Sequence, residues 1–279
     1  MRIFYFLCFF FVAPALNAQQ VHVGFFAGVC NYQGDLQSKK ITFSQSQPAY
    51  GALVLVELSD RFHLRASFMS AAVSATDALG PNADRNLSFA SKVLEGHVGL
   101  EYDLFNLYEK SVTPYVFTGI NLFGFNPYAT DKNGRNVFLQ PLGTEGQGFF
   151  SGREKYALTQ IGVPLGGGFK LRISDNVRLR AEMGLRILFT DYLDDVSSTY
   201  VDQSALLANN GAKAVEMAFR GAEFKPSLVY PGEGAKRGNP KINDYYYTGT
   251  LGISFRLQQR SDRGHLGKGQ YGCPRNVGY

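Results

Sequence analysis

The segment from Asn176 to Thr190 alternates apolar and polar residues almost without interruption. Its apolar set is Val177, Leu179, Ala181, Met183, Leu185, Ile187 and Phe189, and its other set is Arg178, Arg180, Glu182, Gly184, Arg186 and Thr190. Because side chains project alternately to the two faces of a β-strand, the segment predicts a strand with one apolar and one charged face. Its length of roughly fifteen residues exceeds the usual five or six of a soluble sheet and suits a tilted strand that spans a membrane.

Residues 1–18 have the layout of a secretory signal peptide. Met1 and Arg2 form a basic start, an apolar run extends from Ile3 to Val12, and small and polar residues lead to a predicted cleavage after Ala18. The apolar run is too short for an ordinary spanning helix, and no later segment approaches the roughly twenty apolar residues that such a helix needs. We therefore expect an exported protein that reaches a membrane through strands or a surface contact.

Composition and charge limit the classes of fold and partner that the chain can have. Hydrophobic residues make up 45% of the chain, yet the mean hydropathy is −0.13, which indicates that apolar residues are dispersed along alternating strands. The net charge of +5 comes from scattered basic residues, and the export signal also argues against nucleic acid as a partner. The three cysteines form no disulfide framework and no zinc spacing. Without a linker or charge block, one domain is predicted over residues 19–257.

Periodicity predicts eight strands. Their ranges are 21–31, 49–58, 61–75, 88–104, 113–126, 156–173, 176–190 and 245–257. Since a lipid bilayer leaves no hydrogen-bond partner for an open sheet edge, the fold class expected is a closed eight-stranded antiparallel transmembrane β-barrel of the outer membrane. Three connections are short, whereas 32–48, 76–87, 127–155 and 191–244 are long and are expected to face the exterior. The last of them should contain a helix near 203–220 that Gly211 interrupts or splits. Residues 258–279 form a basic tail on the short-turn, periplasmic side.

The polar faces of the strands predict a charge network inside the barrel. Eight strands enclose a space that side chains fill, so the charges should pair across the interior and plug it. The predicted network is Arg65, Glu95, His97, Glu101, Lys170, Arg172, Arg178, Arg180, Glu182, Arg186 and Arg256. Aromatic residues at strand ends, including Tyr102, Phe105, Tyr108, Tyr115, Tyr245 and Tyr247, could form interfacial girdles. The basic residues of the tail are the candidate partner-binding set, namely Arg260, Arg263, Lys268 and Arg275.

The other residue patterns are better explained by structural roles than by catalysis or ligand binding. His97 with Glu95 and Glu101 could form an acid–base cluster, but interior charge pairing is the simpler interpretation. The glycine run 166–168 lacks the lysine and helix of a phosphate loop, and small residues relieve crowding in a narrow barrel. Asp191, Asp194 and Asp195 could supply calcium ligands or acids of an outer-rim hydrolase, but loop hydrogen bonding is favoured. We therefore predict no enzyme, metal or cofactor.

Several stretches resemble a known family, the PorG-like outer-membrane β-barrels of the Bacteroidota type IX secretion machinery. They span most of the chain and comprise residues 31–36 (NYQGDL), 86–89 (NLSF), 113–120 (TPYVFTGI) with Phe123 and 125–127 (FNP), 139–148 (LQPLGTEGQG), 189–197 (FTDYLDDVS) and 237–239 (RGN). The resemblance implies a non-enzymatic envelope protein that associates with a periplasmic ring made of a lipoprotein and its partner.

The predicted function is thus a structural or anchoring barrel of protein secretion, in contact with outer-membrane lipid and periplasmic ring proteins. Two alternatives stay open. A small porin or solute-binding barrel would need an open interior, and an outer-membrane hydrolase would need a nucleophile or paired acids near the outer rim.

Overall fold

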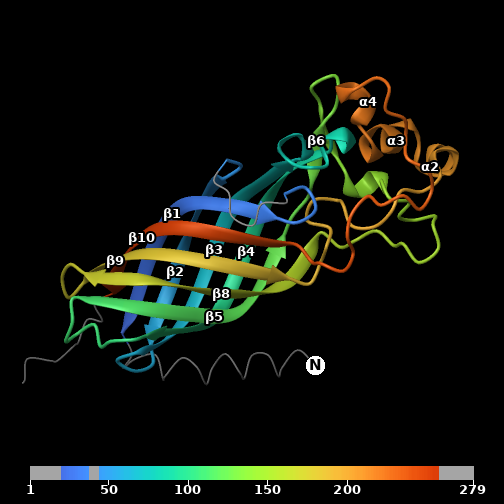
Figure 1. The fold of residues 1–279 in the computed structure, drawn as a ribbon. Coiled ribbons are helices and arrows are strands. Elements are labelled where there is room, and N and C mark those ends of the chain that lie inside the picture. The colour runs from blue at the N-terminus through green and yellow to red at the C-terminus, as the bar shows by residue number, and fades with distance from the viewer. Residues whose placement is uncertain (1–19, 38–43, 258–279) are drawn as a thin grey trace, which may run out of the picture.

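Eight long strands close into an antiparallel barrel in the computed structural model, which describes residues 20–37 and 44–257 (Figure 1). The wall runs in the order β3-β2-β1-β10-β9-β8-β5-β4, and β4 pairs with β3 to complete the ring. The strands are β1 (Val21–Gln33), β2 (Gln47–Glu57), β3 (Phe62–Thr76), β4 (Ser88–Asp103), β5 (Val112–Gly124), β8 (Thr159–Arg172), β9 (Val177–Leu188) and β10 (Tyr245–Leu257). The first and last strands pair from Val21 with Leu257 to Gln33 with Tyr245, which leaves no free edge.

The expected fold class is confirmed, and each barrel strand lies within a few residues of its predicted range. The largest difference is at β8, which begins at Thr159 rather than at 156, and every other strand end lies within two residues of its predicted position. Pro114 lies inside β5 opposite Phe169, and its carbonyl oxygen accepts a hydrogen bond from Leu104 N at 2.9 Å. A proline near a strand end therefore removes one donor without ending the pairing.

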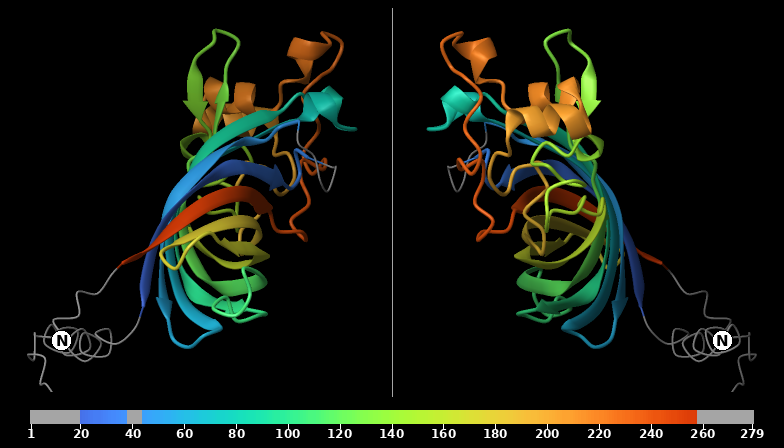
Figure 2. Two further views of the ribbon diagram at one scale, coloured as in Figure 1. Left: turned by 90° about the vertical axis from the view of Figure 1, so that its left-hand side faces the viewer. Right: turned by 90° about the vertical axis from the view of Figure 1, so that its right-hand side faces the viewer.

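Connections differ sharply between the two ends of the barrel. One end, here the short-turn end, carries residues 58–61, 104–111 and 173–176 together with the start of β1 and the end of β10. The other, the loop end, carries 34–37, 44–46, 77–87, 125–158 and 189–244. Figure 2 shows the long connections gathered as a cap above one rim.

The cap contains short elements rather than a second domain. It holds the hairpin β6 (Tyr128–Thr130) and β7 (Asn136–Phe138), the 3-10 turns η2 (Asp77–Leu79), η3 (Ala83–Arg85) and η4 (Gln140–Leu142), and the helices α2 (Gln203–Asn210), α3 (Ala212–Ala218) and α4 (Gly221–Phe224). The predicted helix is indeed split at Gly211, whose φ of 85° suits glycine. The hairpin was not predicted. Within the described ranges, no helix is both long and apolar enough to cross a membrane.

Side-chain polarity on β3 reverses along the strand. From the short-turn end its outward residues are Phe62, Leu64, Ala66 and Phe68, followed by Ser70, Ala72, Ser74 and Thr76. Its inward residues change in the opposite sense, from His63, Arg65 and Ser67 to Met69, Ala71, Val73 and Ala75. A strand that passes from apolar surroundings into water requires this exchange of polarity between its two faces. The outer face becomes polar where it meets water, and the inner face becomes apolar where it packs against other side chains. The switch at Phe68 and Met69 therefore marks where the apolar outer band ends on β3.

Candidate functional site in the barrel interior and cap

The middle of the barrel is filled by an ionic cluster of four side chains. Arg65 of β3 bonds Glu182 of β9 through two contacts of 2.6 and 2.8 Å, and it also reaches Glu101 of β4 at 3.1 Å. Arg180 of β9 bonds both oxygens of Glu101 at 2.5 and 3.1 Å. All four side chains are buried, and Tyr115 donates its hydroxyl to Glu182 at 2.8 Å. Strands on opposite walls are thus joined through the lumen.

A second layer lies toward the short-turn end. Lys170 contacts Glu101 at 2.6 Å and Asp103 at 2.5 Å. Glu57 accepts from Arg178 at 2.8 Å, and its carboxylate also contacts His22 at 2.9 Å and the Tyr108 hydroxyl at 2.7 Å. Each buried carboxylate here has a basic partner, as burial of a charge requires.

A third layer lies toward the loop end and joins β4, β9 and β10. Arg186 approaches the Glu95 carboxylate at 3.2 Å and donates to Thr248 Oγ1 at 2.7 Å. Tyr246 also donates its hydroxyl to Glu95. These residues are buried, so the three layers together occupy much of the inner space.

The structure brings eight of the eleven predicted network residues into these layers and leaves three outside them. His97 is buried, but its Nδ1 contacts Ser67 Oγ at 3.3 Å, and no carboxylate pairs with it in the described ranges. Arg172 and Arg256 lie near the short-turn rim, where the interior opens to solvent. Among the residues that the structure describes, Arg172 forms an ion pair only with the exposed Asp175, at 3.6 Å, and Arg256 is half-buried. Interior pairing is therefore wrong for these three residues.

Sequence reasoning missed several members of the network, namely His22, Glu57, Asp103, Tyr108, Tyr115 and Tyr246. Glu57 and Asp103 continue the inward alternation of their strands by one further step, and that signal would have found them. Tyr108 and Tyr115 do not belong to the predicted interfacial girdles, because their hydroxyls bond interior carboxylates. The tail residues Arg260, Arg263, Lys268 and Arg275 lie outside the described residues.

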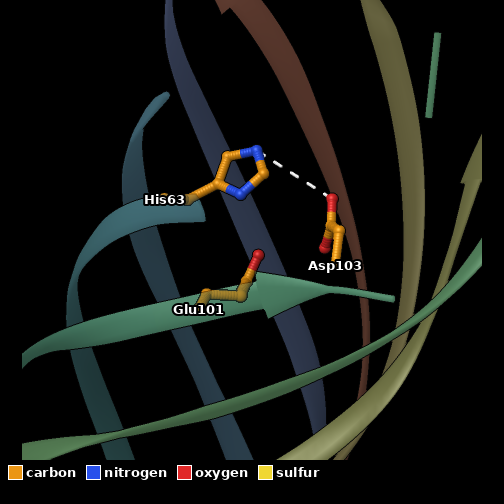
Figure 3. A group of neighbouring side chains, drawn as sticks. All are labelled: His63, Glu101 and Asp103. Carbon is orange, nitrogen blue, oxygen red and sulfur yellow. Dashed lines mark ion pairs between the residues drawn. The ribbon is translucent and has the colours of Figure 1, made fainter. Parts of the chain in front are cut away.

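One group of side chains has the composition of a metal site. Ligand atoms of His63, Glu101 and Asp103 lie within 4.8 Å of one another, and His63 Nε2 is 3.9 Å from Asp103 Oδ2 (Figure 3). The ammonium of Lys170, however, already contacts both carboxylates. A cation from the protein itself therefore supplies the charge that a metal ion would bring, and the group fits an internal ion-pair cluster.

An apolar layer separates the charge network from the cap. Inward residues of β3 and β4 pack with side chains from the long loops, and the layer includes Met69, Val73, Phe89, Val93, Phe123, Phe125, Leu188 and Leu193. Tyr156 stacks between Phe125 and Tyr192, with ring centroids 6.1 and 4.8 Å apart. The loop end of the barrel is thus closed by a packed core that the polar-face prediction did not include.

The cap is held together by charges from loops that are far apart in the sequence. Arg237 donates to Glu145 Oε1 at 2.8 Å and to the Asp195 carbonyl at 2.6 Å, and it is buried. Glu145 also accepts from the backbone N–H groups of Ser197 and Ser198. The segments 139–148, 189–197 and 237–239, which carry the family resemblance, meet in this cluster. The contacts within the cap thus account for the residues found in these three segments.

The aspartates of the last loop accept hydrogen bonds. Asp195 accepts from Thr144 Oγ1 at 2.5 Å and from the Tyr156 hydroxyl at 2.6 Å, and Asp194 accepts from the Tyr32 hydroxyl at 2.6 Å. Burial raises the pKa of Asp195 to about 6, although Arg237 opposes the rise. Loop hydrogen bonding therefore accounts for Asp194 and Asp195.

Comparison with known proteins gives one family and a set of similar folds. The sequence profile described as "Domain of unknown function (DUF6089)" matches residues 1–140. No curated protein sequence matches. Solved structures that resemble this chain include Neisserial surface protein A (NspA), with 13% identity, a TM-score of 0.42 and coverage of 85% of this chain and 97% of that one.

Two further similar structures come from other bacteria. Ail, the attachment invasion locus protein of Yersinia pestis, in complex with sucrose octasulfate, has 9% identity and a TM-score of 0.41 over 86% of this chain and 99% of its own. The outer membrane protein OprG from Pseudomonas aeruginosa has 10% identity and a TM-score of 0.39 over 86% and 96%.

Proposed function

The chain belongs to the family described as a domain of unknown function (DUF6089), and we propose that it is a plugged outer-membrane barrel with a structural or anchoring role in protein secretion. The observation that carries the proposal is the ionic network of the interior. Arg65, Glu101 and Lys170 are at most 2% exposed, so these side chains in the middle of the barrel are almost entirely shielded from water.

A membrane location follows from the outer face. Large apolar side chains there are exposed on every wall strand, for example Phe25 at 59%, Ile120 at 67% and Leu251 at 70%. An exposed apolar band of this extent is unfavourable in water and favourable against lipid. The ring of strands satisfies its own backbone hydrogen bonds, as a bilayer requires. The signal peptide predicted over residues 1–18 would export the chain toward the outer membrane.

The interior supports a positional role rather than transport. Ions or solutes would have to separate buried pairs such as Arg65 with Glu182, and unpaired charges in a dry interior are strongly unfavourable. A fixed barrel can instead hold its partner proteins at one position in the outer membrane. In this proposal the short turns and the basic tail hold periplasmic ring proteins, and the long loops form an external cap.

The type IX assignment is the finer part of the proposal. It is supported by the resemblance to PorG-like barrels, which implies contact with a ring lipoprotein and its partner. The predicted tail offers four basic residues for that contact, namely Arg260, Arg263, Lys268 and Arg275. A basic segment would favour an acidic surface on the ring.

Affinity purification of the tagged protein from envelopes tests this role. We expect ring proteins to be co-purified, and replacement of the four tail residues by alanine should reduce their recovery. Alanine at Lys132 and Arg135, exposed basic residues of the cap, is the matched control and should leave recovery unchanged. Absence of ring proteins, together with normal secretion in a deletion strain, would refute the anchoring role.

Planar-bilayer conductance separates the plugged barrel from the small-porin alternative. The buried network predicts little or no current through the wild-type protein. A stable open conductance would instead favour a porin, because it would show a water path through the layers described above.

A further inference from the structure

One tyrosine ties together the two ends of the longest loop. Tyr32 lies near the end of β1, Asp194 lies six residues beyond β9, and Asp244 immediately precedes β10. The Tyr32 hydroxyl oxygen is 2.6 Å from Asp194 Oδ2 and 3.0 Å from Asp244 Oδ1. All three side chains are at most 1% exposed. Rim and cap are therefore joined at a single buried oxygen.

The two contacts of the Tyr32 hydroxyl oxygen require two protons, and the tyrosine supplies only one of them. A hydroxyl has one proton and can donate it to one acceptor, whereas two carboxylate oxygens face this one. The remaining carboxylate oxygens are already acceptors, since Asp194 Oδ1 takes the N–H of Val196 and Asp244 Oδ2 takes the N–H of Leu193, both at 2.9 Å. The second contact is a hydrogen bond only if one carboxyl is protonated and donates to the tyrosine oxygen.

The surroundings offer the pair little compensating positive charge. Carboxylates of Asp35 and Asp191 face it from the loops after β1 and β9, and Asp191 is 7% exposed, with the Ser197 side chain as its polar neighbour. Farther cap residues are Glu145, Asp195 and Tyr156. The nearby cations are engaged or exposed, because Arg237 bonds Glu145, Arg85 bonds Asp77, and Lys236 lies at the surface. Two full negative charges at the pair would therefore repel each other in a dry site.

Close packing keeps the three groups together. A Cβ atom added at Gly34 would lie 1.9 Å from Asp244 Oδ1 and 2.0 Å from the Tyr32 hydroxyl. Only glycine leaves room for this contact. Leu193, whose N–H bonds Asp244, is fully buried in the apolar layer beneath the cap. Separation of the pair would therefore loosen Leu193 and uncover that layer.

We propose that Tyr32, Asp194 and Asp244 form a proton-held latch, in which a shared proton keeps the cap closed over the barrel and loss of that proton releases it. The latch links the charge state of a buried carboxyl pair to exposure of the apolar layer at the loop end. It does not depend on a role in secretion.

The direction of the pH response follows from linkage. Burial raises the pKa of Asp194 and Asp244 well above the ordinary value, and for Asp244 the charges of Asp194 and Asp191 add to the rise. Burial also raises the pKa of Asp191 to about 7, with Asp35 and Glu145 contributing. A raised carboxyl pKa means that the closed cap binds the proton more tightly than the open cap. Closure of the cap is therefore strongest below about pH 4, which is the ordinary pKa of an aspartate. It weakens as the pH rises from there toward the raised pKa values of the buried carboxyls.

Hydrogen exchange of the full-length protein in lipid nanodiscs, corrected for intrinsic rates, tests the latch. Release of one proton on opening raises the opening constant of segments 189–197 and 236–244 about tenfold per pH unit within this window. Asp244→Asn supplies a permanent donor to Tyr32, so the slope should fall by about one proton. Any slope that remains is assigned to the other cap carboxyls with a raised pKa, namely Asp35, Asp191 and Asp195. Asp84→Asn, at an exposed cap carboxylate, should behave like wild type.

A second variant acts on the contact without changing charge. Gly34→Ala should open the cap at every pH while the barrel strands stay protected, because the added methyl group separates Tyr32 from Asp244. An unchanged slope in Asp244→Asn, or protection in Gly34→Ala equal to wild type, would overturn the proposal. Protection restored at high pH by calcium alone would also overturn it, since a metal ion rather than a proton would then neutralise the pair.

Discussion

Arg65 and Glu182 bond each other through two parallel contacts of 2.6 and 2.8 Å across the middle of the barrel. Their strands, β3 and β9, are four places apart in the ring of eight and so form opposite walls. A single bidentate pair thus spans the lumen, and Arg180 and Glu101 complete a cluster around it. The pair links the alternation of charges along the strands to the closure of the interior.

Loss of one partner of this pair should destabilise the barrel strongly. Arg65→Met leaves Glu182 and Glu101 buried with fewer basic neighbours, and we expect a loss of about 3–5 kcal/mol in the free energy of unfolding from lipid vesicles. Urea titration would measure it. The matched control is Arg172→Gln, because Arg172 forms its ion pair with the exposed Asp175 and should contribute less than about 1 kcal/mol. Equal effects of the two substitutions would contradict the assigned network.

Gly166 should not tolerate even one added carbon. Its added Cβ would lie 2.5 Å from the Met183 carbonyl oxygen and 2.5 Å from the Phe117 ring, and that ring carries the Arg65 guanidinium 4.0 Å from its centroid. Gly166→Ala should therefore cost about 1–3 kcal/mol through overpacking. Gly96→Ala, where an added Cβ meets no atom within 4 Å, should change stability by less than about 0.5 kcal/mol. Heat-modifiable gel mobility and unfolding titrations would compare them, and equal stability would refute the packing argument.

The outer apolar band should reject charge, whereas the cap should accept it. Leu251 of β10 is 70% exposed on the barrel wall, and Leu207 of α2 is 52% exposed in the cap. Leu251→Arg should cost about 2–4 kcal/mol if this position lies near the middle of the bilayer. Leu207→Arg should be nearly neutral, because its side chain already faces water. Comparable stability of both variants in lipid vesicles would show that the wall does not face hydrocarbon.

Arg237 should stabilise the cap without stabilising the barrel. Arg237→Ala leaves Glu145 buried without its arginine, so the cap should open at a cost of about 3–5 kcal/mol. Limited proteolysis would then cut within 189–244 at a higher rate, while the strands remain resistant. Lys213→Ala removes the two ion pairs of a lysine that is 38% exposed, with Asp131 and with Glu216, and should have little effect. Faster unfolding of the whole barrel in the Arg237 variant would contradict a cap-specific role.

The strands of the barrel wall could be predicted because each strand is defined by the pattern of residues within its own segment. Alternation along 176–190 defines β9 by itself, and the short turns at 58–61 and 173–176 define two hairpins. Gly211 similarly marked the break between two helices. The same alternation assigned eight interior charges, but at the rim, where Arg172 and Arg256 lie, periodicity alone does not show that solvent replaces a partner.

The cap could not be predicted in this way, because its contacts join distant residues. Arg237 and Glu145 are 92 residues apart, and Tyr32 is 212 residues from Asp244. No spacing rule relates such positions. The polarity reversal on β3 was visible in the sequence, but its meaning depends on knowing which residues face inward. Sequence patterns therefore gave the barrel and most of its charges, whereas the apolar layer and the latch required the folded chain.

The central claim is that the barrel presents apolar side chains to lipid around a closed ionic interior. The chain contains no tryptophan, so a single introduced one gives an unambiguous fluorescence signal. In vesicles of brominated lipid, Leu179→Trp on the outer face of β9 should be strongly quenched by bromine and protected from aqueous iodide, and Leu207→Trp in the cap should show the reverse. Strong iodide quenching at position 179 without bromine quenching would contradict the account.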